Sequence, residues 1–500
     1  MVFLLSAIIL SHLYLPFRSN FDPREINIDY IILERARITG QVHLNTTIKP
    51  VLTGDLKFKT ASPESAYFSG AGNPNLYLKI RLRDWGYLSR FTPQAHTSLN
   101  ESENYMHLCG EAYLRRGNFE ILHSSAVFSE ERDHRFDLAY YDPLLNPDFR
   151  LYTFDVAPPI GHSYKFDVRT DVAYLHFANR WIDFSVGRLP VRLGPGFRSS
   201  LFLSGYALPL KYVYNFRVRK DWLEFMGAYA VFPDTLKWKR MAYQRLVLSP
   251  FDFLEIGFNQ GAIWVDSDPF KYFDPVDFYY IVQRRGRDNS DNLIGGADIS
   301  IYLFNKIKVY SEFFDDDFII TGGSPSKYGI MAGTHIVDPF GVAGSDLIVE
   351  FTHVNPWTYP HYYSDYRSNP EILGYPIGFW AGPACNVLTL DFIKFTKISS
   401  GFARGFRIGY EYLQHADQDM RDGWGGHMSM TPPPYNFDVR NSLRVIAFQK
   451  SNRFSYEAGA EVSFMSGESL KGSRVTLRFN VEGVPFILDF TKLFSSISSR

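Results

Sequence analysis

Polar and apolar residues alternate one by one along many stretches of this chain, and the connections between those stretches alternate between short and long. Residues 164–177 show the first alternation clearly. One parity carries Tyr164, Phe166, Val168, Val172 and Tyr174, and the other carries Lys165, Asp167, Arg169 and Asp171. Residues 456–464 and 474–482 repeat the pattern. Successive side chains of a β-strand point to opposite faces of a sheet, so the pattern predicts strands with one apolar and one polar face.

The connections distinguish a membrane barrel from a soluble sandwich. Short connections include residues 178–180, 219–221, 249–252, 304–306 and 450–453. Long connections lie between them, at residues 189–204, 264–292, 314–326, 356–383 and 416–438. Transmembrane barrels have short periplasmic turns and long extracellular loops. Pairing the strands in sequence order gives roughly 18 strands, an even number that leaves both chain ends on the periplasmic side.

Composition agrees with a transmembrane barrel. Aromatic residues make up 17% of the 500 residues, with 44 Phe and 32 Tyr. Such barrels carry aromatic girdles at both membrane interfaces. After the N-terminal segment, no stretch approaches the ~18 consecutive apolar residues that a membrane helix needs. We therefore expect an all-β fold, a transmembrane up-and-down antiparallel β-barrel in the bacterial outer membrane. A large soluble sandwich or propeller is the alternative, although the sequence has no blade-length repeat.

Four segments are expected along the chain. Residues 1–19 are apolar at their start, like the hydrophobic region of a signal peptide, although the basic start and a clear cleavage site are lacking. A short hydrophobic element of the folded protein is the alternative. Residues 20–61 are assigned to the periplasm as a small plug or base, with a helix that begins near Asp29 and stops at Gly40. The barrel is assigned to residues 62–482 and a periplasmic tail to residues 483–500.

Several functional classes find no support in the sequence. The formal net charge of −1 gives no signal for nucleic-acid binding. Cys109 and Cys385 are far apart and show no metal-type spacing, and a disulfide between them is neither predicted nor excluded. The nucleophile elbow Gly-x-Ser-x-Gly is absent, and His353 and His361 do not form a zinc-like motif. We expect no enzyme activity, no metal site and no cofactor.

The long connection at residues 356–383 is rich in aromatic side chains. Its candidates for glycan binding are Trp357, Tyr359, His361, Tyr362, Tyr363 and Trp380. Aromatic faces can stack on the apolar faces of sugar rings, while neighbouring polar groups bind hydroxyls. The equally weighted alternative is a loop that packs its own aromatic residues into the barrel mouth.

Charged residues on the polar parity are expected to face the lumen. They include Asp167, Arg169, Asp171, Arg407, Glu411, Arg474 and Arg478. Such charges could tune selectivity or hold a plug, and the favoured alternative is that they pair with one another and stiffen the wall. The connection at residues 264–292 carries Asp266, Asp268, Asp274, Asp277, Asp288 and Asp291. Clustered carboxylates can bind Ca²⁺, but a solvated loop with Asx-turns is favoured here.

The middle of the chain resembles the capsule assembly Wzi family of outer-membrane barrels. The motifs that carry the resemblance lie at residues 186–196, 201–204, 207–209, 291–298, 310–316, 374–378 and 382–383. They include a Gly-Arg entry, a Gly-Pro-Gly turn, a Leu-x-Leu-Ser segment, a Gly-Gly-x-Asp strand opening, a Tyr-x-Glu-Phe strand end and a Gly-x-Pro-x-Gly approach to a strand. Residues 30–40 are loosely similar to the family's periplasmic helical start. The resemblance covers roughly residues 177–395.

The resemblance implies a barrel of about 18 strands with periplasmic helices. It also implies a non-enzymatic, lectin-like role, in which the barrel binds and organises exported capsular or extracellular polysaccharide at the cell surface. The expected partners are surface polysaccharide and outer-membrane lipid, and a long polymer would bind by avidity. A pore for small solutes is the chief alternative, and an outer-membrane enzyme acting on lipid or glycan is the third. An open lumen would favour the pore, and a lumen closed by plugs and inward loops would favour the binding platform.

Overall fold

The fold is taken from a computed structural model. It describes residues 27–49, 51, 58–69, 76–91, 101–116, 118–130, 153–156, 164–205, 209–233, 238–265, 268–285, 291–316, 327–361, 368–372, 375–416, 420, 436–451, 454–467 and 472–487. Of residues 69, 76–91, 101–116, 124–130, 153–156, 164–171, 233, 238, 375 and 454, and of most of residues 472–487, it describes the backbone only. The expected signal segment and the end of the C-terminal tail lie outside the described residues.

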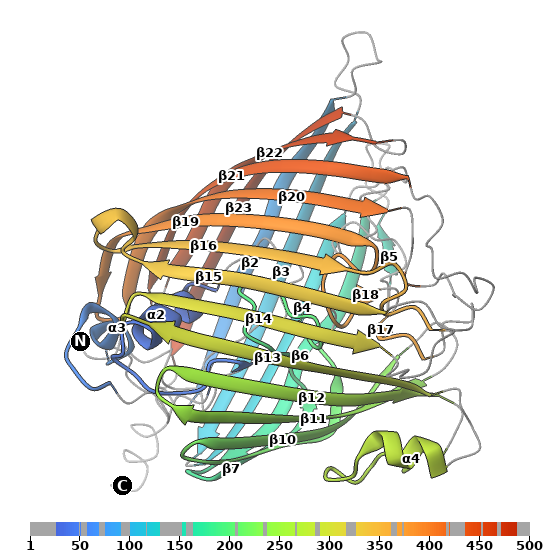
Figure 1. Cartoon of the computed structure of the whole chain (residues 1–500). Coiled ribbons are helices and arrows are strands. Elements are labelled where there is room, and N and C mark those ends of the chain that lie inside the picture. Colours follow the sequence, from blue (N-terminus) through green and yellow to red (C-terminus); the bar gives the residue numbers. More distant parts are fainter. Residues whose placement is uncertain are drawn as a thin grey trace, which may run out of the picture.

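Eighteen strands among the described residues form one closed ring of antiparallel pairs (Figure 1). In chain order they are β2 (Leu76–Phe91), β3 (Glu101–Arg116), β4 (Phe119–Glu130), β6 (Tyr164–Ala178), β7 (Ile182–Arg188), β9 (Lys211–Lys220), β10 (Leu223–Pro233), β11 (Trp238–Phe251), β12 (Leu254–Trp264), β13 (Asn292–Leu303), β14 (Ile307–Asp316), β15 (Tyr328–Val337), β16 (Ser345–Val354), β19 (Cys385–Ser399), β20 (Phe402–Ala416), β21 (Phe437–Ser451), β22 (Phe454–Ser466) and β23 (Gly472–Ile487). Each strand pairs with the next in this series, and β23 pairs with β2, which closes the ring. The predicted up-and-down barrel of about 18 strands is confirmed.

The wall of this barrel is apolar outside and polar inside. On β20, Phe406, Ile408 and Tyr410 are exposed, whereas Arg407 and Glu411, which have the other parity, are buried. Pleating sends alternate side chains to opposite faces, so an exposed apolar set and a buried charged set on one strand define an outer lipid-facing wall and an inner polar wall.

The strand connections are short at one end of the barrel and long at the other, as predicted. β13 and β14 are joined by residues 304–306, and β19 and β20 by residues 400–401. The turn between β15 and β16 includes the 3₁₀ helix η5 (Pro339–Gly341). At the opposite end, residues 355–384 connect β16 to β19 and contain the small pair β17 (Glu371–Ile372) and β18 (Tyr375–Pro376). We call these two ends the short-turn end and the long-loop end.

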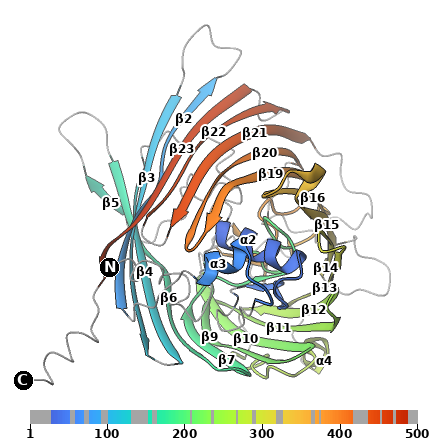
Figure 2. The ribbon, with the colours of Figure 1, turned by 90° about the vertical axis from the view of Figure 1, so that its left-hand side faces the viewer.

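Two helices fill the barrel at the short-turn end, α2 (Ile28–Ile38) and α3 (Pro63–Ser69) (Figure 2). The Asn27 side chain caps α2 by accepting a hydrogen bond from the Asp29 N–H at 3.1 Å. Gly40 follows the helix with φ +72°, a conformation that glycine adopts without strain, so the predicted start and stop of this helix are confirmed. Among the described residues, no helix is both long enough and apolar enough to cross a bilayer.

The prediction of which side chains of residues 164–177 share a face is wrong for the C-terminal half of this segment. A β-bulge interrupts the pairing of β6 with β4, between Ser124 and Ser125. The extra residue in β6 exchanges the inner and outer faces for the side chains that follow it, because side chains alternate between the faces with a period of two. Tyr174 therefore lies buried on the inner face, where its hydroxyl donates to Glu120 at 2.7 Å, and Leu175 is 48% exposed on the outer face.

Candidate functional site

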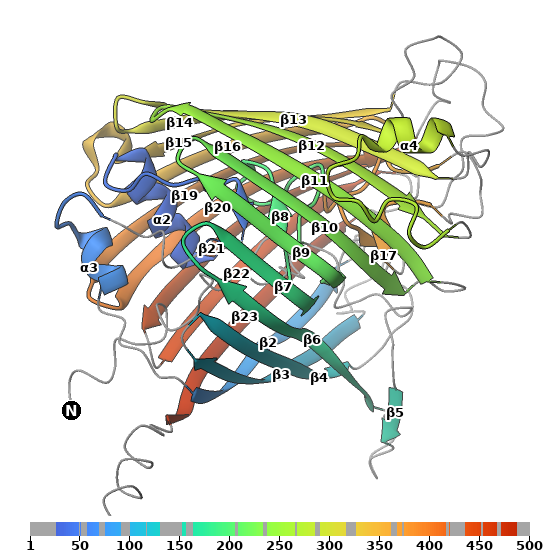
Figure 3. The same cartoon turned by 90° about the horizontal axis from the view of Figure 1, so that it is seen from below.

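The long connection at residues 189–204 folds into the lumen instead of extending outward. We call it the inward loop. Its short strand β8 (Arg192–Leu193) pairs with β1 (Ile48–Lys49), so it meets the N-terminal segment inside the ring of barrel strands (Figure 3). The N–H of Gly194 donates to the Thr47 carbonyl at 2.9 Å. Two segments far apart in the sequence thus form a small sheet within the barrel.

Carboxylates on the inner wall bind the backbone of the inward loop. One carboxylate oxygen of Glu312, on β14, accepts from the Ser200 hydroxyl at 2.8 Å and from the N–H groups of Leu201 at 2.9 Å and Phe202 at 3.1 Å. Glu350, on β16, accepts from the Phe197 N–H at 2.7 Å. These contacts satisfy backbone donors that the loop has taken away from water.

Arg198 anchors the same loop to two further strands of the wall. Its guanidinium bonds Asp391 on β19 through Nε at 2.9 Å and Nη2 at 2.7 Å, and it bonds Glu411 on β20 through Nη1 at 2.7 Å. All three side chains are at most 1% exposed. Buried charges require partners on every side, because an unpaired one is costly to desolvate.

Further wall residues complete the charge balance around this anchor. Arg407 bonds the second oxygen of Asp391 at 2.6 Å, and Arg444 lies 3.3 Å from Glu411. Gly409 separates Arg407 from Glu411 along β20. A Cβ atom there would lie 2.7 Å from an Asp391 oxygen, so the absence of a side chain leaves room for the pair. The network therefore joins loop and wall into one buried unit.

Arg407 and Glu411 are buried on the inner side of the wall. Arg407 pairs with Asp391, and Glu411 pairs with Arg198 of the inward loop. The other predicted lumenal charges lie at positions where only the backbone is described: Asp167, Arg169, Asp171, Arg474 and Arg478.

Tyr359 ties the inward loop to the long connection that follows β16. Its hydroxyl donates to the Leu201 carbonyl at 2.8 Å and accepts from the Phe379 N–H at 2.9 Å. Its own N–H donates to Asp316, at the end of β14, at 2.8 Å. Its backbone has φ +82°, which costs a non-glycine residue free energy that these surrounding hydrogen bonds must offset.

The motifs that carry the family resemblance meet at this place. Ser204 donates its N–H to the Ile377 carbonyl at 2.9 Å. A Cβ atom on Gly378 would lie 2.4 Å from the Leu201 carbonyl oxygen, so glycine is required for this approach. Glu312 and Asp316 belong to the Tyr-x-Glu-Phe strand end. The sequence pattern identified these segments but did not predict that they assemble inside the lumen.

The aromatic candidates for glycan binding are largely interior. Trp357 is 4% exposed, Tyr359 0%, His361 8% and Trp380 2%, whereas Tyr362 and Tyr363 lie outside the described residues. Tyr359 and Trp380 belong to one hydrophobic cluster with residues of the inward loop, such as Leu201. Burial of these four side chains is what the alternative of a self-packed loop predicts.

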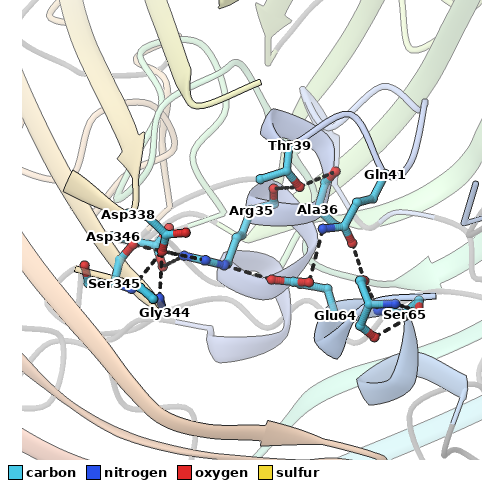
Figure 4. A network of polar contacts seen from close by, with 12 residues as sticks. Arg35, Ala36, Thr39, Gln41, Glu64, Ser65, Asp338, Gly344, Ser345 and Asp346 are labelled. Carbon is cyan, nitrogen blue, oxygen red and sulfur yellow. Dashed lines mark hydrogen bonds and ion pairs between the residues drawn. The ribbon is translucent and has the colours of Figure 1, made fainter. Parts of the chain in front are cut away.

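Helix α2 is joined to the wall at the short-turn end by ion pairs (Figure 4). The Arg35 guanidinium bonds Glu64 of α3 at 2.8 Å and Asp338 of the β15–β16 turn at 2.7 Å, and it lies 3.4 Å from Asp346. Burial opposes ionisation of Asp338, but its hydrogen bond with Arg35 outweighs this and lowers its pKa. The arginine thus links both helices to the barrel.

Other charges of α2 contact different parts of the wall. Arg37 bonds Glu255 of β12 at 3.0 Å, and Glu34 accepts from Lys308 of β14 at 2.6 Å. Burial alone would raise the pKa of Glu34, but the ammonium group of Lys308 outweighs it and lowers that pKa to about 2. The helix is therefore held by ionised groups around much of its circumference.

The acidic loop between β12 and β13 shows the expected Asx-turns. Asp268 accepts from the Phe270 N–H at 2.9 Å, and Asp274 accepts from the Val276 N–H at 3.0 Å. Asp291 is buried and accepts from the Tyr272 hydroxyl at 2.9 Å. Within the described part of the chain, no three acidic, His or Cys side chains are grouped as metal ligands would be. Asp266 and Asp288 lie outside the described residues.

Comparisons with known proteins agree with this architecture. The model of the family described as capsule assembly protein Wzi matches residues 81–413. No curated protein matches the chain. The outer-membrane protein Wzi of Escherichia coli, a carbohydrate-binding β-barrel involved in group 1 capsule assembly, has a similar structure. Its TM-score is 0.61 at 14% sequence identity, over 92% of this chain and 98% of that one.

More distant barrels are also similar. They include OccAB4 of Acinetobacter baumannii, with TM-score 0.43 and 10% identity, and OccK7 of Pseudomonas aeruginosa, with TM-score 0.43 and 9% identity. Each match covers 82% of this chain and 98% of the other. The family model covers well over half of the sequence, and the barrel topology agrees with it. The chain therefore belongs to the capsule assembly Wzi family of outer-membrane β-barrels.

Proposed function

We propose that this protein binds and organises exported capsular or extracellular polysaccharide at the cell surface, as a lectin-like platform without enzymatic activity. The observation that carries the proposal is the inward loop. It occupies the lumen and is bonded to the wall through Glu312 on β14 and through Arg198, which contacts Asp391 on β19. A channel for solutes needs a continuous water-filled path, whereas a binding platform needs a rigid base beneath its outer loops. The carbohydrate-binding barrel of Escherichia coli supports the same function.

The proposed orientation places the short-turn end in the periplasm. Residues 20–61 then form a periplasmic plug whose helix α2 seals the barrel, and residues 483–500 form a periplasmic tail. Residues 62–482 make up the barrel domain. In the structure, the first barrel strand begins at Leu76 and the last runs to Ile487. The long-loop end then faces the extracellular side, where an exported polymer is available.

Polysaccharide would contact the loops at the long-loop end. Each contact with a sugar unit is weak, so retention of a long polymer depends on many contacts made together. The buried rings of Tyr359 and Trp380 are assigned a supporting role, in which they fix the loop that presents the binding groups. Tyr362 and Tyr363 of the same connection are assigned direct contact with the glycan.

Two measurements on the refolded protein test this function. Planar bilayers are used to record conductance, and immobilised protein is used to retain the cell's own surface polysaccharide. We expect electrically silent bilayers together with retention that falls when soluble polysaccharide competes. Steady large openings without retention would instead establish the alternative, a pore for small solutes.

A further inference from the structure

The connection between β12 and β13 folds back over the outside of the barrel. Its described part, residues 268–285, ends in α4 (Tyr279–Arg285), which lies outside the wall near the long-loop end (Figure 3). The Asp277 carbonyl accepts from Gln244 of β11 at 2.9 Å and from Gln260 of β12 at 3.2 Å. These two residues pair with each other in the sheet and alternate with the buried inner residues Arg245 and Asn259. They therefore point outward, and the connection covers the outer wall.

A layer of aromatic rings fixes this cover on the wall. Tyr229 of β10 packs against Trp264 with ring centroids 5.7 Å apart and against Phe273 at 5.3 Å. Tyr272 packs against Trp264 at 4.9 Å and against Tyr279 at 5.4 Å. The hydroxyl of Tyr229 also donates to the Pro269 carbonyl at 2.6 Å. The segment is thus a built part of the fold, held at a definite height on the barrel.

The segment extends down the wall toward the apolar belt. Pro275 lies against Gly227 of β10, where a Cβ atom would come within 3.0 Å of it. Gly227 is six residues from the end of β10 at the long loops, so the cover descends to about the middle of that strand. Phe258, two residues below Gln260 on β12, is 48% exposed on the outer face. Phe258 belongs to the lipid-facing wall, so the cover adjoins the bilayer.

The outer surface of the cover is itself apolar. Phe270, Val276 and Phe278 are each 69% exposed, and Ile281 of α4 is 48% exposed. A soluble surface seldom exposes so many large apolar side chains on one short segment. The last turn of α4 adds Arg284 and Arg285, both exposed, beside this apolar surface. Arg284 packs on the Tyr280 ring at 5.1 Å, a combination of aromatic and basic groups typical of the membrane interface.

We infer that residues 268–285 form a lipid-binding element on the outside of the barrel. Phe270, Val276, Phe278 and Ile281 enter the outer edge of the apolar layer, and Arg284 and Arg285 meet lipid phosphates. An apolar side chain beside the wall gains free energy by leaving water, and a guanidinium group at the interface pairs with phosphate. The element gives the barrel a fixed depth in the outer leaflet and requires no glycan.

Spin-label accessibility in vesicles tests this placement. Single cysteines are introduced as Phe270→Cys and Phe278→Cys in the full chain, after Cys109→Ser and Cys385→Ala. Matched controls are Val309→Cys on the lipid-facing wall and Lys59→Cys in the water-exposed N-terminal segment. The protein is reconstituted at low density in phosphatidylcholine vesicles. Collision rates with oxygen, which enters lipid, and with a polar nickel chelate, which does not, are compared.

We expect labels at positions 270 and 278 to give oxygen-to-nickel ratios close to that of position 309. Ratios equal to that of position 59 would place the segment in water and overturn the inference. Shielding from both reagents, with dipolar broadening between labels, would show that a second copy covers the surface and would overturn it as well. None of these outcomes depends on polysaccharide.

A second arm tests the phosphate contact. Anionic phosphatidylglycerol is added to the vesicles, and the label at position 278 is measured with and without Arg284→Gln and Arg285→Gln. We expect anionic lipid to raise the oxygen-to-nickel ratio of the parent protein and to leave that of the double variant unchanged. An equal response in both proteins would exclude the two arginines as the phosphate ligands.

Discussion

Arg198 of the inward loop bonds Asp391 on the barrel wall through two guanidinium nitrogens, at 2.9 and 2.7 Å, although the two residues are 193 positions apart in the chain. The same side chain reaches Glu411 at 2.7 Å. A single arginine therefore joins the loop to two strands of the wall. Two guanidinium nitrogens donate to the same oxygen of Asp391 and a third donates to Glu411, so the position of the guanidinium group on the wall is fixed.

Replacing Arg198 is expected to release the inward loop. The variant Arg198→Met leaves two buried carboxylates with fewer partners, and loss of one member of a buried ion pair costs about 3–5 kcal/mol of unfolding free energy. Arg407 and Arg444 still pair with these carboxylates, so we expect a cost of about 3 kcal/mol in urea unfolding, at the lower end of that range. We also expect new channel openings in planar bilayers. Arg404→Met serves as the control, because Arg404 lies on the outer face of β20, the strand that carries Glu411. A silent and fully stable Arg198→Met would show that the loop is held by other contacts.

Acidification is expected to loosen α2. The pKa of Glu34 is lowered to about 2, below its unfolded value of about 4.3, so ionised Glu34 stabilises the docked helix above that value. This stabilisation, about 3 kcal/mol, is lost as the pH falls from about 4.3 toward 2. The lowered pKa of Asp338 acts in the same direction. Hydrogen exchange of the α2 amides should therefore accelerate below pH ~4.

The variant Glu34→Gln supplies the control for this pH effect. It should exchange faster than the parent protein at neutral pH and should respond less to acid, because it has lost one of the two titrating groups. If parent and variant responded equally to acid, the Glu34–Lys308 pair would have no part in the docking of α2.

A charge on the outer wall is expected to impair membrane insertion. Val445 on β21 pairs with Ile408 on β20, and both are exposed, at 50% and 40%. Arg in place of Val445 should cost roughly 2–4 kcal/mol near the bilayer midplane. The free energy can be measured by reversible folding into phosphatidylcholine vesicles, with Val445→Leu as the matched control. Equal folding of both variants would argue against lipid contact at this position.

Two sets of variants separate glycan contact from loop support. Tyr362→Ala with Tyr363→Ala is expected to lower polysaccharide retention and leave unfolding unchanged. Tyr359→Phe keeps the ring but leaves the Leu201 carbonyl and the Phe379 N–H unpaired, so it should cost roughly 2 kcal/mol of stability. Trp357→Ala and Trp380→Ala should also lower stability, because both rings are buried.

Retention and unfolding are measured on the same preparations. If retention falls only in those variants that also lose stability, the connection at residues 356–383 supports the binding surface without touching the polymer. If Tyr362→Ala with Tyr363→Ala retains polysaccharide as well as the parent protein, these two residues are removed from the binding site.

The sequence by itself determined the barrel. Side-chain direction in a strand has a period of two residues, so Phe406, Ile408 and Tyr410 had to share one face and Arg407 and Glu411 the other. The short and long connections then determined which strand ends lie together. These features are local, and they depend on neighbouring residues along the chain and on the contrast between lipid and water.

Only the tertiary structure decided where the long connections go. Residues 189–204 turn inward because Asp391 binds Arg198 and Glu312 binds the Leu201 N–H on the inner wall. Residues 268–285 turn outward because Gln244 and Gln260 bind the Asp277 carbonyl on the outer wall. The β-bulge in β6 likewise reverses a face that parity alone had assigned. The paths of these connections and the position of the bulge depend on contacts between residues far apart in the chain. A local alternation of polar and apolar residues cannot predict such contacts.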